Sequence, residues 1–213
     1  MYTLYWNRRT RAASVHMLLE EAGIPYQLHH IDISRGEHQS PDYLALNPKG
    51  LVPTLVTDTG DVLSETGAML MHIADRQDVK GLVPSPDDPA RGAFLDWFFY
   101  HLCVLQEPYK RYHFPHRYSS DATHIDGITE RATQTIESHW NYLEAHLATN
   151  GPFHLGARFG LNDILLATYC VFTSGIPDFC TRFPAVARCY ELVKSRPALT
   201  AILQDHETPT PRT

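Results

Sequence analysis

A stretch near residue 50 combines groups that could bind a small charged peptide. Val52 and Pro53 begin an apolar run typical of a strand, and proline belongs at a strand's edge or first residue, or in a cis bond. A cis bond would leave the N–H and C=O of Val52 outside the sheet. Glu65 and Thr66 then open a helical pattern, so a carboxylate lies beside the free N–H groups of a helix N-terminus. An ordinary hairpin with an edge proline is the alternative.

This stretch resembles the glutathione-binding half of the glutathione transferases. That family carries an N-P-x-G-x-V-P-x-L segment, and then an acidic residue or Gln followed by Ser or Thr at a helix start. The matching residues are Asn47, Pro48, Gly50, Val52, Pro53, Leu55, Glu65 and Thr66. The resemblance implies that Val52 and Pro53 present the backbone of Val52 to the cysteinyl part of glutathione. It also implies that Glu65 holds the γ-glutamyl ammonium, and that Thr66 with its helix N–H groups binds the γ-glutamyl carboxylate.

The glycine end of glutathione has fewer candidates. His38 falls where some classes of the family place a His for the glycine carboxylate, and Lys49 is a second candidate for the same group. Many bacterial relatives carry Lys or Gln immediately before the Val-Pro pair, where this chain has Leu51. A surface His is the alternative for His38, and plain helix capping is the alternative for Glu65 and Thr66.

The catalytic group in this family lies at the end of the first strand or in the following loop. The thiolate of glutathione is the nucleophile, and a hydroxyl donor with a helix N-terminus can lower the thiol pKa. When the first helix is aligned, Tyr5 falls at the Tyr of the tyrosine-type transferases, while Arg9 and Arg11 replace the Ser and Cys of other classes. We predict Tyr5 as the donor, with Arg9, Thr10 and Arg11 as the reserve. A Tyr in a first strand is alternatively a core residue.

The order of elements predicts two domains. Residues 1–78 read as βαβ, loop, ββα, a thioredoxin-like unit with a mixed sheet whose first two strands are parallel. Residues 79–88 are rich in Pro, Asp and Gly and read as a linker. Residues 89–213 show helical stripes, which predict an all-helical domain. The expected elements are strands at 2–6, 26–33, 51–56 and 62–63, and helices at 12–22, 66–77, 94–105, 125–147, 161–173, 184–195 and 198–204.

An α/β unit followed by a helical bundle resembles the glutathione transferases from end to end. The string at residues 154–168 is similar to the family's G-x-x-x-S-x-x-D element, which starts the central helix as a capping box. Asp163 is in place, but Gly160 stands where Ser or Thr is usual. Glycine at a cap costs only a few tenths of a kcal/mol, so the helix start is expected to survive.

The resemblance places a second substrate against the helix and loop around residues 98–118. The segment is unusually aromatic, and an aromatic lining suits flat apolar electrophiles. The candidates are Phe98, His101, Tyr109 and Tyr112. Packing of the same side chains into the domain or a dimer contact is the alternative.

Composition bounds the class of protein. The 213 residues are 43% hydrophobic and 20% charged, with a net charge of −6, so no basic surface for nucleic acid or anionic membrane is expected. No apolar run approaches the ~20 residues that span a bilayer, and no signal peptide precedes the first strand. The histidines and cysteines show no metal spacing. We expect a cytoplasmic protein without a metal.

Together these observations predict an enzyme of the glutathione transferase type, with glutathione as co-substrate, a small hydrophobic electrophile and a homodimeric state. Two alternatives stay open. One is a glutathione-dependent disulfide or peroxide reductase that uses the same thiolate. The other is a non-catalytic binding or regulatory protein that kept the fold, which the departures at Arg9, Leu51 and Gly160 favour.

Overall fold

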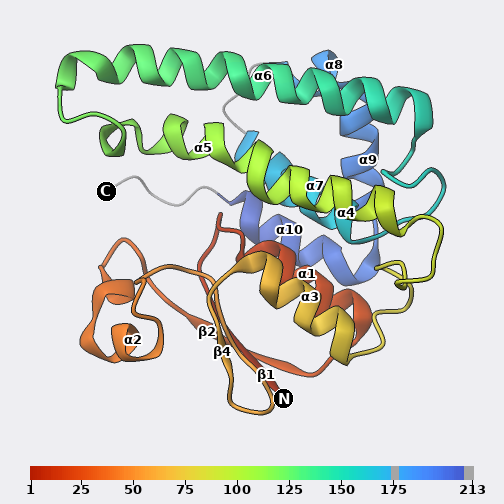
Figure 1. Cartoon of the computed structure of the whole chain (residues 1–213), viewed down its shortest axis with the longest axis horizontal. Coiled ribbons are helices and arrows are strands. Elements are labelled where there is room, and N and C mark those ends of the chain that lie inside the picture. Colours follow the sequence, from red (N-terminus) through yellow and green to blue (C-terminus); the bar gives the residue numbers. More distant parts are fainter. Residues whose placement is uncertain (174–177, 209–213) are drawn as a thin grey trace. The chain divides into compact units, whose positions relative to one another are not determined.

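A mixed four-stranded sheet organises the N-terminal part of the computed structural model, which describes residues 1–173 and 178–208 (Figure 1). The strands are β1 (Tyr2–Trp6), β2 (Tyr26–His30), β3 (Thr54–Val56) and β4 (Val62–Leu63), in the order β2-β1-β3-β4. β1 is parallel to β2 and antiparallel to β3, and β3 is antiparallel to β4. The predicted mixed sheet with a parallel first pair is therefore confirmed.

Helices cover this sheet as the apolar patterns require. α1 (Ala12–Ala22) packs against β1 and against α3 (Thr66–Arg76), and α10 (Pro197–Glu207) packs along α1. Tyr2 and Leu4 alternate on β1 and are both buried, as expected for one face of a half-buried strand. Gly23 ends α1 in the left-handed conformation, with its N–H bonded back into the last turn. Between β2 and β3 lie only the short 3₁₀ helix η1 (Glu37–Gln39) and α2 (Pro41–Leu46).

The rest of the described chain is helical, which confirms the predicted fold class of a thioredoxin-like α/β domain followed by helices. The elements are α4 (Arg91–Phe99), the π-helix η2 (Tyr100–Leu105), α5 (Gln106–His113), the 3₁₀ helices η3 (Pro115–Arg117) and η4 (Ala122–His124), α6 (Ile125–Asn150), α7 (Leu161–Cys170), the 3₁₀ helix η5 (Val171–Thr173), α8 (Phe179–Arg182) and α9 (Pro184–Lys194). α5 packs along the long helix α6 (Figure 1).

The helix expected at residues 94–105 continues past Pro108, where we expected a loop. Helical structure runs without a break from α4 through η2 into α5, and Pro108 lies inside α5. Proline lacks an N–H and its ring clashes with the carbonyl four residues earlier, which is Val104 within η2. The wider π-turn removes the need for that ordinary helical bond, so the helix continues past the proline.

The chain divides into two compact units that differ from the predicted domain boundaries. One unit comprises Met1–Val83 with the described residues of Ile164–Ile176 and Leu192–Thr213. The other comprises Pro84–Asp163 with the described residues of Pro177–Glu191. The sheet thus shares a unit with α10, because α10 packs along α1. The division into 1–78, 79–88 and 89–213 stays a prediction.

Asp163 caps α7 as the sequence predicted. Its Oδ2 accepts the Gly160 N–H at 2.8 Å, which is the half of the capping box that survives the loss of a Ser or Thr side chain. Its Oδ1 accepts the backbone N–H of His154 at 2.9 Å and pairs with His154 Nδ1 at 2.8 Å. Both side chains are buried, so this cap is also a polar core.

Candidate functional site

The segment that precedes β3 and the segment that follows β4 leave the sheet at the same edge. β3 and β4 are antiparallel with Leu55 opposite Leu63, so the residues before Thr54 and those after Leu63 lie at the same end of this strand pair. The Val52–Pro53 peptide is cis, one of the two states expected for this proline. The N–H and C=O of Val52 make no hydrogen bond to any described residue. A free backbone edge therefore lies where the sequence predicted one.

A hydrogen-bond network below this edge fixes its shape. The carbonyl of Leu51 accepts from the Tyr43 hydroxyl and from Asn47 Nδ2, both at 2.8 Å. Asn47 Nδ2 also donates to Thr54 Oγ1 at 2.8 Å, and Asn47 and Thr54 are buried. These bonds satisfy the carbonyl of Leu51 and the hydroxyl of Thr54, whereas the N–H and C=O of Val52 between them stay without a hydrogen bond to a described residue. Asn47 thus acts as a scaffold of the turn, a role that its place in the motif did not reveal.

The N-terminus of α3 has unsatisfied donors. Thr66, the first residue of α3, is 1% exposed, and its Oγ1 has no hydrogen-bond partner among the residues that the structure describes. Glu65 is the N-cap residue but makes no side-chain cap bond, so plain capping does not account for the Glu65-Thr66 pair. The N–H of Met69 makes the first bond back to the Glu65 carbonyl. The earlier N–H groups and the buried hydroxyl together suit an anion such as a carboxylate.

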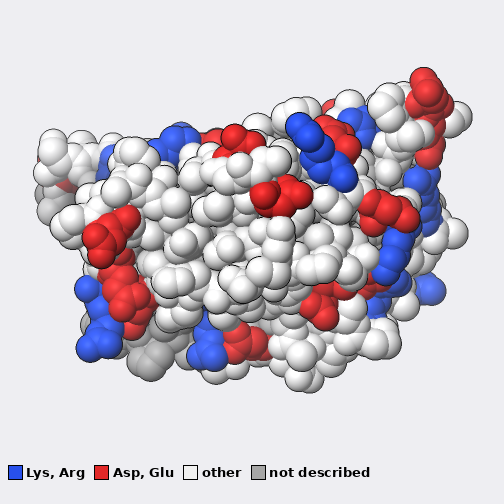
Figure 2. Space-filling model, turned by 90° about the horizontal axis from the view of Figure 1, so that it is seen from below, with Lys and Arg blue, Asp and Glu red and all other residues white. Residues whose placement is uncertain are grey.

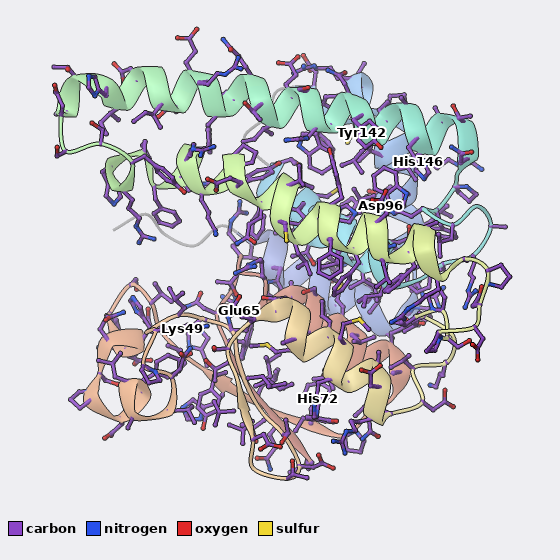
Figure 3. All side chains as sticks on the ribbon, viewed as in Figure 1. Lys49, Glu65, His72, Asp96, Tyr142 and His146 are labelled. Carbon is purple, nitrogen blue, oxygen red and sulfur yellow. The ribbon has the colours of Figure 1, made fainter. Side chains whose placement is uncertain are left out.

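Lys49 and Glu65 form an ion pair at this edge (Figure 3). Lys49 Nζ lies 2.8 Å from Glu65 Oε1, and the two side chains are 49% and 66% exposed. An exposed pair contributes little to stability, so an ammonium group of a ligand could replace Lys49 at low cost. The contact shows that Glu65 holds a cation at this position. It also ties up the Lys49 ammonium that was predicted to serve the glycine carboxylate.

His38 lies in η1, close in sequence to residues that support the same turn. Its Nδ1 is buried without a hydrogen-bond partner among the described residues. The neighbouring Gln39 donates from Nε2 to the carbonyl of Gly50 at 3.1 Å. His38 is only partly exposed, which differs from the alternative of a freely solvated surface His.

Tyr5 projects from β1 on the face opposite to Leu4. Its ring lies 4.8 Å from that of His29 and 6.1 Å from that of Tyr43, measured between centroids. The side chain is partly exposed, and the hydroxyl has no hydrogen-bond partner among the described residues. A hydroxyl with a free proton can donate to a thiolate, which keeps Tyr5 as our prediction for the catalytic donor.

The loop after β1 is internally bonded. The Thr10 hydroxyl donates to the Asn7 carbonyl at 2.7 Å and accepts the Ala12 N–H at 3.3 Å. It therefore serves the loop and the start of α1, and would lose a bond by donating to a thiol. Arg9 has φ 52°, in the left-handed region, and Arg11 is the N-cap residue of α1 without a side-chain cap bond. The charged residues Arg9 and Arg11 thus stay the stronger members of the reserve.

The predicted second-substrate residues are mostly buried in their own unit. Tyr109 is 6% exposed and its hydroxyl accepts the Trp140 Nε1–H at 2.8 Å, while Phe98 is 1% exposed and stacks on Phe94. His101 is fully buried, with its Nε2 3.0 Å from that of His154. These contacts favour the packing alternative for Phe98, His101 and Tyr109. Tyr112, with 41% of its surface exposed, is the one predicted residue open to a ligand.

His101, His154 and Asp163 form a buried chain of hydrogen bonds. Asp163 pairs with His154 Nδ1, and His154 faces His101 through Nε2. Burial, and secondly His154, lowers the pKa of His101 well below its ordinary value. His101 is therefore neutral at physiological pH. His146, labelled in Figure 3, donates from Nε2 to the carbonyl of His154 at 3.0 Å.

Charge and membrane propensity agree with the composition. The face in Figure 2 carries acidic and basic side chains interspersed among uncharged ones. None of the helices in the described part of the chain is long and apolar enough to cross a membrane. Across residues 1–173 and 178–208, no group of three His, Cys, Asp or Glu side chains is arranged to hold a metal ion.

The chain is similar to known proteins over most of its length. Residues 11–76 match the family model "Glutathione S-transferase, N-terminal domain". The disulfide-bond oxidoreductase YfcG of Escherichia coli (strain K12) is 27% identical over 205 residues, which cover 93% of this chain and 92% of that protein. Glutathione S-transferase 3 of Zea mays is 28% identical over 203 residues, covering 92% and 90%.

A solved structure of a glutathione transferase homologue from Sulfitobacter, with bound glutathione, superposes with a TM-score of 0.88. It is 28% identical and covers 98% of this chain and 99% of its own. The matched N-terminal model, the two relatives and this neighbour agree with the fold described above. Residues 11–76 thus match the N-terminal domain of the glutathione S-transferases, and the chain is similar to proteins of this kind over more than nine-tenths of its length.

Proposed function

We propose that the protein is a glutathione transferase that binds glutathione at the edge of β3 and α3. The thiolate then attacks an electrophilic carbon of a small hydrophobic substrate, so that a C–S bond forms while the bond to a leaving group such as chloride breaks and the leaving group departs as an anion. In this proposal the backbone of Val52 pairs with the cysteinyl backbone of glutathione. Glu65 binds the γ-glutamyl ammonium, which replaces Lys49 as its ionic partner. Thr66 and the N–H groups at the α3 N-terminus bind the γ-glutamyl carboxylate. His38 and the displaced Lys49 serve the glycine carboxylate.

The observation that carries the proposal is the buried, unpartnered Thr66 hydroxyl at the start of α3. A buried hydroxyl without a partner costs about 1–3 kcal/mol, and a bound carboxylate oxygen would recover this cost. The free backbone of Val52 adds a second set of unsatisfied groups at the same sheet edge. Glutathione, which stands bound in the Sulfitobacter neighbour, has a carboxylate and a peptide backbone that match these groups.

The catalytic role of Tyr5 is tested by Tyr5→Phe. The ring contacts with His29 and Tyr43 remain in this variant, so the fold is retained and only the hydroxyl is lost. We expect the pKa of the bound thiol to rise and turnover with a chloronitrobenzene to fall about 100-fold, as for removal of one oxyanion donor. Tyr142→Phe, at a 53% exposed tyrosine outside the 98–118 segment, is the control. Full turnover and an unchanged thiol pKa in Tyr5→Phe would transfer the role to Arg9, Thr10 or Arg11.

A glutathione-dependent disulfide reductase is the second candidate. It is favoured by the similarity to a disulfide-bond oxidoreductase over 93% of the chain. It is compatible with the absence of cysteine from residues 7–11, because bound glutathione supplies the thiol. Activity with a mixed disulfide, measured against activity with a chloronitrobenzene, distinguishes the two reactions.

We also propose that the protein acts in the cytoplasm as a homodimer. Sedimentation equilibrium would test the dimer, since a mass near the 24.2 kDa of one chain would contradict it.

A further inference from the structure

The loop between β1 and α1 is held by the last turn of α10. The backbone N–H of Arg9 donates to His206 Nδ1 at 3.1 Å, across 197 residues of sequence. Beside this bond, Arg8 Nη2 lies 2.6 Å from Asp205 Oδ1. Arg9 adopts φ 52°, which a side chain with a Cβ rarely takes unless its surroundings hold it there. Both contacts therefore fix a loop whose backbone would not stay in this turn by itself.

His206 is built into the core rather than lying on the surface. It is 0% exposed, and its ring lies 5.5 Å from that of Trp6, the last residue of β1. At the start of α10, Arg196 pairs with Glu21 of α1. α10 is thus tied at one end to α1 and at the other end to the loop that precedes α1.

The surroundings of His206 keep its Nδ1 an acceptor. Burial, and secondly the facing His16, lower its pKa from 6.5 to about 4, while Asp205 raises it and Arg8 lowers it. The ring is therefore neutral across the pH range in which a thiolate is used. With Nδ1 accepting the Arg9 N–H, the ring proton lies on Nε2.

We propose that His206 is a positioning residue of the candidate thiol site. Its Nδ1 accepts the Arg9 N–H, and its ring packs on Trp6. It thereby fixes both the end of β1, which carries Tyr5, and the turn that carries the reserve residues. The inference rests on the proposed function, because the position of this loop affects chemistry only if the glutathione thiol is activated there.

Two substitutions separate the hydrogen bond from packing. His206→Phe keeps a ring against Trp6 and deletes the acceptor, whereas His206→Asn carries an amide oxygen close to the place of Nδ1. Should His206→Phe fail to fold, His206→Gln replaces it, because its amide lies one bond farther out. Lys194→Gln is the control. It removes the ion pair between Lys194 of α9 and Glu207, which follows His206 on α10, and leaves the bond between His206 and Arg9 in place.

The readouts are amide hydrogen exchange at Arg9, the pKa of the bound glutathione thiol, and kcat and KM with a chloronitrobenzene. In His206→Phe we expect exchange at Arg9 to be faster, the thiol pKa to rise by about half a unit and kcat to fall about five-fold, the equivalent of one lost hydrogen bond. KM should change little. His206→Asn should restore the thiol pKa, and Lys194→Gln should match the unaltered protein.

The outcomes distinguish this inference from the function on which it rests. If the thiol pKa is lowered in the unaltered protein and is equally low in a folded His206→Phe variant, the positioning role of His206 is overturned and the proposed function is not. Equal loss in His206→Asn and His206→Phe would also overturn it, because packing would then explain the effect. An unshifted thiol in the unaltered protein would contradict the proposed function, and the inference with it.

Discussion

We predicted substrate contacts in two regions, the edge formed by residues 51–66 and the aromatic segment 98–112. The polar atoms of the two regions differ in whether they have hydrogen-bond partners within the protein. At the edge, the Val52 backbone and the Thr66 hydroxyl have no partner among the described residues. In the segment, the Tyr109 hydroxyl accepts from Trp140 and His101 faces His154. Polar groups that await a ligand are left unsatisfied, whereas those of a core are paired within the protein.

This difference gives a criterion that sequence patterns lack. An aromatic stripe at helical spacing looks the same whether it lines a substrate site or fills a core. The partner of each polar atom decides between the two. By this criterion we expect the 51–66 edge to bind a ligand and the 98–109 part of the segment to form a core, so changes in the two regions should affect different measurements.

The largest effect is expected from Asp163→Ala, on the core side of the comparison. The substitution leaves the buried His154 and Gly160 N–H donors without their acceptor, so the free energy of unfolding should fall by about 3–5 kcal/mol. Urea denaturation measures this loss. Asp126→Ala, at an exposed acid in the first turn of α6, is the matched control and should change stability by less than about 0.5 kcal/mol. A loss for Asp163→Ala as small as that of the control would break the comparison.

Thr66→Val probes the binding side. Because the hydroxyl has no partner among the residues that the structure describes, its removal should leave stability unchanged or slightly higher. The dissociation constant of glutathione should rise about 10- to 100-fold, as for a lost hydrogen bond to a charged group. Calorimetric titration provides the measurement.

Thr173→Val supplies the reverse control for this prediction. The Thr173 hydroxyl donates to the Cys170 carbonyl at 2.6 Å, so its loss should cost about 1 kcal/mol of stability and leave glutathione affinity unchanged. If Thr66→Val behaved like Thr173→Val, Thr66 would be a structural residue.

Acid sensitivity gives a smaller, graded effect. The pKa of His101 is lowered in the folded state, so below about pH 6.5 the unfolded state binds a proton that the folded state does not. Stability from this group is fully present above pH 6.5 and falls by up to about 1.4 kcal/mol per pH unit as pH decreases below it. His101→Gln keeps an amide near Nε2 without titrating, so its stability should fall less steeply between pH 6.5 and 5. If the free energy of unfolding fell equally steeply with pH in His101→Gln and in the unaltered protein, His101 would not be the group that destabilises the protein in acid.

The sequence predicted the elements whose signals are local. The N-P-x-G-x-V-P-x-L segment lies in the turn after α2 and the beginning of β3, and Gly23 marks the end of α1, so both features followed from a few neighbouring residues. The continuation of the helix past Pro108 did not follow, because it depends on a π-turn that no local pattern specifies. The bond between Arg9 and His206 joins residues 197 positions apart, and nothing in either residue's neighbourhood announced it.

The side chains of residues 98–112 show the same limit for the site. Helical spacing correctly placed Phe98 and His101 on one apolar face, but it did not say whether that face meets a ligand or other helices. Their burial favours packing against other helices. For Val52 and Thr66 the prediction rests on a motif and on unsatisfied groups, two observations that are independent of each other, whereas Glu65 is paired with Lys49.

The central claim is that this protein binds glutathione at the β3–α3 edge and lowers the pKa of its thiol. A pH titration of thiolate absorbance for glutathione bound to the unaltered protein tests it most directly. We predict saturable binding with a bound-thiol pKa about two units below the free value near 8.5, a preference for the anion of about 2.7 kcal/mol. Binding with an unshifted thiol, or no binding, would contradict thiolate activation and favour a non-catalytic protein that kept the fold.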